Sequence, residues 1–194
     1  IRTDAIGGFN AFLAQQQAEP GELRMTIVLF NHEIETIHAR LPAAEVPPVP
    51  YGTWELLRDG KDVAIPATGT MVVPGLQAAE QLAAEGIDAT VVNCRFLKPL
   101  DTGMLQMRTA SHRTLVTVEE GTVVNGFGAY LAETVQAIAP DVRVIALGVP
   151  DRLVEQAPRA DQLAAFGLTA EGIARRVTAL HGEDSARGRS HAGF

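Results

Sequence analysis

After residue 52 the chain alternates short apolar runs with amphipathic stretches, and this alternation restricts its possible folds. Strand-length apolar runs occur at 63–67, 89–93, 114–118 and 142–147. Helical patterns follow them at 74–86, after Asp101, and at 128–138, 160–166 and 170–180. Strands that alternate with helices form parallel sheets with right-handed crossovers and helices on both faces. The sequence therefore predicts an α/β fold of three layers around a mostly parallel sheet.

The segment "LPAAEVPPVPYG" at 41–52 marks a change in sequence character, since four of its twelve residues are proline. Proline disrupts helices and central strands alike. We therefore expect a linker at 47–52 between a small segment at 1–46 and the α/β domain at 53–182. Residues 183–194 show no periodicity, which predicts a flexible tail.

The small segment reads as one helix and two strands. Its helical pattern lies in "TDAIGGFNAFLAQQQ", with Thr3 or Asp4 as the cap. Strands are expected at 25–30 and 34–39, joined by a turn at Asn31–His32. These elements are too few to cover both faces of a sheet.

Composition restricts the class of protein. The chain has 194 residues, of which 46% are hydrophobic and 20% charged, as in soluble globular proteins. A net charge of -7 without a basic run argues against nucleic-acid binding. No apolar run reaches the roughly 18 residues that span a bilayer. Cys94 is the single cysteine and the start lacks a signal-peptide pattern, so we expect a cytoplasmic protein, or a fragment of one.

The candidate site follows from the predicted sheet, because such sheets bind ligands at the carboxyl ends of their strands. The segments there are "ATGT", "NCRFLKPLD", "VEEGTVVNGFG" and "LGVPD". Arg95 is the main candidate, since a guanidinium matches phosphate or carboxylate. The alternative is a surface ion pair or a loop cap. Further candidates at this edge are Thr70, Lys98, Glu120 and Asp151.

Two features near the third strand leave alternatives open. Glu119 and Glu120 are adjacent and so alternate faces, which argues against a matched acid–base pair. One of them is expected to cap a loop or pair with a cation. The stretch "NGFG" at 125–128 opens a helix, where it either cradles an anion on backbone N–H groups or simply forms a tight turn.

The sequence holds no self-sufficient catalytic constellation. Its five histidines lack a second ligand at metal-binding spacing, and no G-x-S-x-G elbow is present. Cys94 lies in an apolar run, where a packed, inert thiol is expected. We therefore predict no catalytic residues and no metal ligands in this chain.

Five segments carry a family resemblance. These are "DVAIPATGTMV", "ATVVNCRFLKPLD", "LVTVEEGTVVNGFGAYL", "VIALGVPDRLVEQA" and "AAFGLTAEGIARRVTAL". In this order, across about 51–182, they resemble the carboxy-terminal domain of 1-deoxy-D-xylulose-5-phosphate synthase, in the transketolase-like superfamily. The resemblance implies a transketolase C-terminal-like fold.

The resemblance also implies a function. The full synthase condenses pyruvate with glyceraldehyde 3-phosphate on thiamine diphosphate and Mg2+, as the first step of an isoprenoid route. Its carboxy-terminal domain packs on the pyrimidine-binding domain within a homodimer. Arg95 is similar to the arginine that grips the aldehyde's phosphate. The family's G-D-G…N metal motif and pyrimidine-binding domain are not in this sequence, so we expect the chain alone to bind no cofactor and to be inactive.

The sequence departs from the usual pattern of the family at two positions. Gln156 stands where the family usually has histidine, and Asn125 replaces a glycine of G-G-F-G.

Two alternative functions are left open by the sequence. The first alternative is the beta subunit of a 2-oxo acid dehydrogenase, which shares the arginine before P-L-D. "GVPDRLVEQA" and "FGLTAEGI" favour the synthase. The second alternative is a non-catalytic module that binds a phosphometabolite or a protein. We also expect a homo-oligomer, or association with the remaining synthase domains.

Residues 1–49 resemble a different family. "IRTDAIGGFNAFLAQQQAEPGELRMTIVLFNHEIETIH" is similar to the piece of a von Willebrand factor A-type domain that follows its metal motif. That motif, D-x-S-x-S, is not in the sequence, so we expect no Mg2+ binding by this segment.

Overall fold

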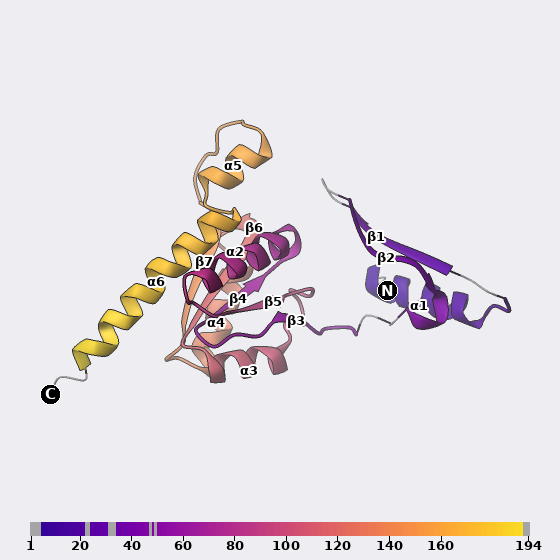
Figure 1. Ribbon diagram of the computed structural model, residues 1–194, viewed down its shortest axis with the longest axis horizontal. Coiled ribbons are helices and arrows are strands. Elements are labelled where there is room, and N and C mark those ends of the chain that lie inside the picture. The colour runs from indigo at the N-terminus through magenta and orange to yellow at the C-terminus, as the bar shows by residue number, and fades with distance from the viewer. Residues whose placement is uncertain (1–4, 22–23, 31–33, 47, 49, 192–194) are drawn as a thin grey trace. The chain divides into compact units, whose positions relative to one another are not determined.

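The structure is a computed structural model that describes residues 5–21, 24–30, 34–46, 48 and 50–191. The chain forms two compact units, Ile1–Tyr51 and Gly52–Phe194 (Figure 1). The division between them falls within the predicted linker at 47–52.

A five-stranded sheet organises the second unit. Its strand order is β3-β5-β4-β6-β7. Strands β4 to β7 run parallel, and β3 pairs with β5 in the antiparallel direction at one side of the sheet. The strands are β3 Glu55–Arg58, β4 Val63–Ala67, β5 Ala89–Asn93, β6 Thr114–Thr122 and β7 Arg143–Val149. Strand β3 was not predicted from the sequence, because a four-residue strand at the side of the sheet, exposed on most of its length, shows no clear alternation.

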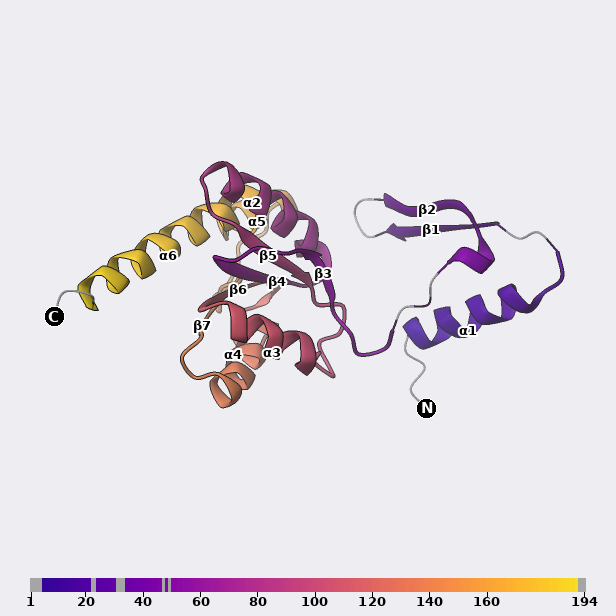
Figure 2. The same cartoon turned by 60° about the horizontal axis from the view of Figure 1, so that its bottom comes forward.

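Helices cover both faces of this sheet, as Figure 2 shows. On one face lie α2 (Val72–Ala84) and α6 (Ala170–His191), which pack on one apolar cluster. On the other face lie α3 (Thr102–Ser111) and α4 (Phe127–Ile138), which pack on a second cluster with Trp54. The predicted three-layer, mostly parallel α/β fold is confirmed.

Several local signals explain where these helices begin and end. The Asp101 side chain caps α3 by accepting a hydrogen bond from the Met104 N–H at 2.9 Å. The Thr169 hydroxyl accepts from the Gly172 N–H at 3.2 Å and so caps α6. Gly86 follows α2 with a φ of 81°, where glycine avoids the penalty of other residues. Of these signals, the helix start after Asp101 was predicted from the sequence.

The carboxy-terminal part differs from the prediction. A short helix, α5, spans Arg159–Ala165, and α6 then continues to His191. The segment 183–191 is thus helical, while the flexibility predicted for 183–194 stays a prediction. Extending an existing helix costs less than starting one, so a segment without an apolar pattern can still continue the helix before it.

The first unit contains one helix and a two-stranded antiparallel sheet. Helix α1 spans Ala5–Ala18, β1 spans Arg24–Phe30, β2 spans Ile34–Pro42, and the short 3-10 helix η1 follows at Ala43–Glu45. The Gln17 amide donates to the Ala43 carbonyl at 2.8 Å, which ties α1 to η1. The predicted helix–strand–strand order is confirmed. The Thr3 or Asp4 cap and the turn at Asn31–His32 lie outside the described residues.

Candidate functional site at the carboxyl edge of the sheet

The segments after the four parallel strands meet at one edge of the sheet, as the sequence predicts. Backbone hydrogen bonds join neighbouring strand ends directly. The Cys94 N–H donates to the Ala67 carbonyl at 2.9 Å, and the Thr68 N–H donates to the Val118 carbonyl at 3.0 Å. This carboxyl edge is therefore a continuous surface on which the candidate residues can be located one by one.

Arg95 extends toward the start of β3. Its Nε donates to the Thr53 carbonyl at 3.3 Å, and its Nη2 donates to the Thr53 hydroxyl at 3.1 Å and the Trp54 carbonyl at 3.4 Å. Its Nη1 lies 3.8 Å from Glu55 Oε2. Because the side chain is only 23% exposed, these contacts occupy most of the guanidinium. Arg95 fastens β3, the outermost strand, to β5. Its phosphate-binding role stays a prediction.

The Glu119 carboxylate binds the helix start at "NGFG", where the sequence left open an anion site or a tight turn. Its Oε2 accepts from the Phe127 N–H at 2.9 Å, and its Oε1 accepts from the Gly128 N–H at 2.8 Å. The residue is 5% exposed. Helix N-termini favour an anion because their N–H groups have no partner within the helix. At α4 that anion is the chain's own carboxylate.

The glycines of this turn are required by packing. A Cβ at Gly126 would overlap the Thr122 carbonyl, and one at Gly128 would overlap the Thr117 hydroxyl and lie 2.6 Å from the Ala146 Cβ. Asn125 adopts a positive φ of 57°. Asparagine tolerates this conformation better than most residues, so its replacement of glycine is compatible with the turn.

Glu120 lies in a polar cluster with Thr70 and Arg159. Its Oε2 accepts from the Thr70 hydroxyl at 2.5 Å. Arg159 of α5 donates from Nε to Oε1 and from Nη2 to Oε2, each at 2.5 Å. The cluster brings two predicted residues together with Arg159, which the sequence analysis missed. A lone arginine after Pro158 gives no signal of which strand end it will reach.

The two other predicted residues lie apart from this cluster. The Lys98 ammonium lies 5.9 Å from the centre of the Tyr130 ring, in a cation–π arrangement. Asp151 is exposed after the end of β7. Neither geometry by itself indicates a ligand.

Cys94 is buried beneath this edge. Burial, and secondly the charge of Asp101, raise the pKa of its thiol well above the usual value. The neutral thiol packs with Trp54 and Phe127 in one apolar cluster. A thiol held neutral is a weak nucleophile, which supports the prediction of an inert cysteine.

The described residues do not fit thiamine diphosphate or Mg2+. Within them no three His, Cys, Asp or Glu side chains gather as metal ligands. The glycine-containing helix start, which could hold a diphosphate, already binds Glu119. The helices of the described part also include none that is long and apolar enough to span a bilayer.

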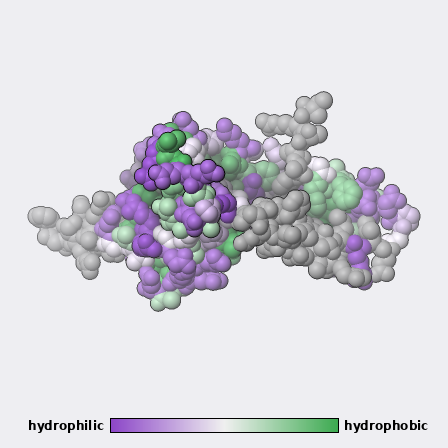
Figure 3. Space-filling view, turned by 90° about the horizontal axis from the view of Figure 1, so that it is seen from above, coloured by the Kyte–Doolittle hydropathy of each residue, from purple (hydrophilic) through white to green (hydrophobic). Residues whose placement is uncertain are grey.

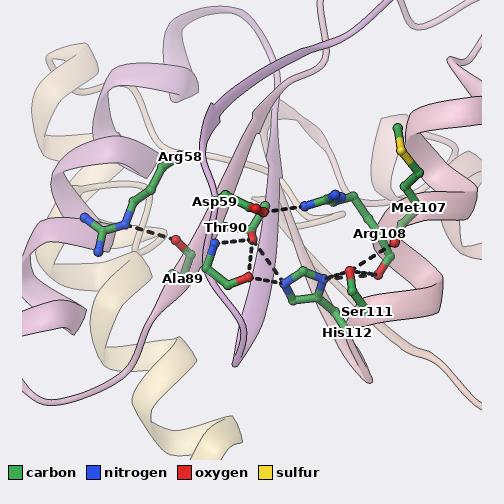
Figure 4. A network of polar contacts seen from close by, with 9 residues as sticks. Arg58, Asp59, Ala89, Thr90, Met107, Arg108, Ser111 and His112 are labelled. Carbon is green, nitrogen blue, oxygen red and sulfur yellow. Dashed lines mark hydrogen bonds and ion pairs between the residues drawn. The ribbon is translucent and has the colours of Figure 1, made fainter.

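A second polar network lies at the opposite, amino edge of the sheet (Figure 4). His112 is 3% exposed, and its Nε2 lies 3.1 Å from both the Thr90 hydroxyl and the Gly60 carbonyl. Its Nδ1 lies 2.8 Å from the Ser111 hydroxyl. Arg108 pairs with Asp59 nearby at 2.7 Å. His112 thus ties the end of α3 to β5 and the turn before β4.

Comparison with known proteins places the second unit in a recognisable group. The family model described as "Transketolase, C-terminal domain" matches residues 52–173. A 1-deoxy-D-xylulose-5-phosphate synthase of Synechococcus sp. (strain JA-2-3B'a(2-13)) is 48% identical over 132 residues, which cover 68% of this chain and 20% of that protein. A synthase of Geobacillus thermodenitrificans is 40% identical over 137 residues, 70% of this chain and 22% of that protein. The chain spans about a fifth of the length of these relatives.

Solved structures show the same likeness. A chain described as "Split gene transketolase, inactive beta4 tetramer" is 37% identical, with a TM-score of 0.63 over 68% of this chain and 43% of that chain. A transketolase from Pichia stipitis, 18% identical, has a TM-score of 0.51 over 72% of this chain and 20% of that chain. The second likeness shows the fold alone.

Proposed function

The chain belongs to the transketolase C-terminal domain family, and we propose that it serves as the carboxy-terminal domain of a 1-deoxy-D-xylulose-5-phosphate synthase. The observation that carries this proposal is the 48% identity to a protein of that name over 132 residues. Under this proposal the full enzyme condenses pyruvate with glyceraldehyde 3-phosphate, on thiamine diphosphate and Mg2+, in the cytoplasm.

The chain's own part in this reaction is structural and positional. Within its described residues no three His, Cys, Asp or Glu side chains gather as metal ligands, and we propose that the residues that bind and activate thiamine diphosphate belong to other synthase domains. The carboxyl edge supplies a rigid surface, because Glu119 and Arg95 hold α4 and β3 in place. By itself the chain is inactive. Detection of deoxyxylulose phosphate from the chain with both substrates, thiamine diphosphate and Mg2+ would contradict this.

A domain exchange tests the proposal directly. The corresponding domain of the Synechococcus synthase is replaced by residues 52–182 of this chain. We expect the hybrid to fold and to form deoxyxylulose phosphate at a rate within about tenfold of the parent enzyme, since volume and patterning are kept across related cores. A folded hybrid that binds thiamine diphosphate but forms no product would reject the proposal.

The same hybrid tests the phosphate role of Arg95. If Arg95 grips the aldehyde's phosphate, Arg95→Ala raises KM for glyceraldehyde 3-phosphate and leaves KM for pyruvate unchanged. Glu55→Gln is the matched variant, since it removes the carboxylate 3.8 Å from the guanidinium and leaves the arginine available. If Arg95 only fastens β3, Arg95→Ala lowers stability and changes neither KM selectively.

Self-association is a further part of the proposal. Large apolar side chains are exposed at several described positions, among them Tyr51, Leu97, Met107, Val124 and Leu153. In the view of Figure 3 green groups of this kind alternate with hydrophilic ones. The 37% identical split-gene transketolase is described as a tetramer. Sizing chromatography of the full chain is expected to show a mass above 20.7 kDa that falls on dilution. A monomer at all concentrations would contradict this expectation.

The two alternative functions make different predictions. Calorimetry of the full chain with glyceraldehyde 3-phosphate separates a phosphometabolite-binding module, which releases or takes up heat, from a domain that needs its synthase partners. A 2-oxo acid dehydrogenase beta subunit would instead fail the domain exchange described above.

A further inference from the structure

We propose that Thr70, Glu120 and Arg159 form a latch that fixes residues 150–158 at the carboxyl edge. Breaking the latch releases this segment while the rest of the second unit stays folded. The inference rests on the geometry of the cluster and does not depend on the proposed function.

The segment at 150–158 connects β7 to α5 without helix or strand. Its polar contacts are largely local. The Arg152 N–H donates to the Pro150 carbonyl at 2.9 Å, and the Gln162 amide of α5 donates to the Glu155 carbonyl at 3.0 Å. Neither bond joins the segment to the sheet. Leu153 is 96% exposed, and within 151–158 Val154 alone is partly buried, so little apolar packing holds the middle of the segment.

Helix α5 is attached to the body of the unit at its two ends. None of its residues is fully buried. Toward its carboxyl end, Leu163 and the following Phe166 are partly buried against the apolar cluster of α2 and α6. At its first residue, Arg159 donates both Nε and Nη2 to Glu120. The ionic attachment is the one that adjoins the irregular segment, so it determines where that segment ends.

Glu120 joins three parts of the chain that are distant in sequence. Thr70 follows β4, Glu120 lies in β6, and Arg159 begins α5. A bidentate arginine–carboxylate contact fixes direction as well as distance. The two side chains are 36% and 34% exposed, so water and salt screen them partly. An ion pair of this exposure adds little to global stability but can control a local opening.

Hydrogen exchange of the full chain, read by mass spectrometry in peptides that cover 150–158, tests the latch. Glu120→Gln and Arg159→Gln each remove the ion pair. We expect amide exchange at 151–157 to become about tenfold faster in both variants, with exchange in β4 to β6 unchanged. The matched control is Arg143→Gln, which removes the Arg143–Glu183 ion pair at 3.2 Å and should leave 151–157 unchanged.

Two additional arms make the test decisive. Glu120→Arg combined with Arg159→Glu restores opposite charges and should return exchange at 151–157 toward the unsubstituted rate. Raising salt to 1 M should speed exchange in the unsubstituted chain and have little effect in Glu120→Gln. Unchanged exchange at 151–157 in both single variants, or equally faster exchange throughout the unit, would overturn the proposal.

Discussion

The two edges of the sheet satisfy their polar groups in different ways. At the carboxyl edge two carboxylates accept the hydrogen bonds. Glu119 is buried against the start of α4, and Glu120 is half-buried against Arg159. At the amino edge the buried network of Figure 4 joins His112 to hydroxyl and carbonyl groups. At the carboxyl edge, where α/β sheets usually bind ligands, carboxylates of the same chain thus bind the start of α4 and the Arg159 guanidinium.

The hydrogen-bond donors of the carboxyl edge are largely occupied by side chains of the same chain. A ligand site keeps donors available, whereas here the N–H groups of Phe127 and Gly128 and the guanidinium of Arg159 all bind side chains of the same chain. The internal carboxylates order the loops without any ligand. Under the proposed function, that arrangement suits a surface presented to other domains better than a site that works alone.

The largest effect is expected where the start of α4 packs against the strands of the sheet. In Gly128→Ala the new Cβ would overlap the Thr117 hydroxyl and lie 2.6 Å from the Ala146 Cβ. Either α4 moves or the strands part, so we expect the free energy of unfolding to fall by about 3 kcal/mol, measured by urea denaturation.

The matched control for that substitution is Gly182→Ala in α6. No atom lies within 4 Å of the site of its new Cβ. Alanine should there raise the free energy of unfolding by up to about 1 kcal/mol through helix propensity. Equal effects of the two substitutions would show that backbone packing does not constrain the carboxyl edge.

The next effect distinguishes the two carboxylates of that edge. Glu119→Gln places an amide NH2 group against a backbone N–H in a buried position, so one donor loses its acceptor. We expect a loss of about 2–3 kcal/mol in the free energy of unfolding. Glu120→Gln, at the half-exposed neighbour, should cost no more than about 1 kcal/mol. If Glu120→Gln costs as much as Glu119→Gln, the assignment of Glu119 as the internal cap of α4 is wrong.

Substitution of His112 at the amino edge should have a weaker effect than substitution of Glu119, because the groups that contact His112 are uncharged hydroxyls and carbonyls. His112→Leu removes both ring nitrogens and leaves the Thr90 and Ser111 hydroxyls without this partner. We expect a loss of about 1–2 kcal/mol. His112→Asn keeps a donor and an acceptor and should lose less. Identical losses for the two variants would mean that packing, not hydrogen bonding, holds this edge.

Local sequence signals predicted the fold well, and the candidate site only in part. Asp101 and Thr169 mark helix starts because capping depends on neighbours three residues away or less. The strand ends converge because parallel strands share one direction. The partner of Arg95 was not predictable, since Thr53 precedes an edge strand too short to show a pattern.

The same reasoning explains the two glutamates. Their adjacency indicated different environments, and the expectation that one caps a loop or pairs with a cation agrees with both contacts. Sequence alone could not assign the roles. Glu119 faces α4 because Gly126 and Gly128 let the helix approach, and Glu120 meets Arg159 only through the fold of the 150–158 segment.

The smallest effect is expected at Glu171, in the first turn of α6 and away from both edges. A hydrogen bond from its own backbone N–H, followed by one from Thr169, lowers the pKa of this exposed carboxyl. A lowered pKa in the folded state means that the ionised form stabilises the helix above the unfolded value of about 4.3, and that this stabilisation is lost as pH falls through the folded value. Glu171→Gln should therefore lower Tm slightly at pH 7 and leave it unchanged near pH 2. A Tm difference of the same size at both pH values would show that the charge of Glu171 does not contribute to the start of α6.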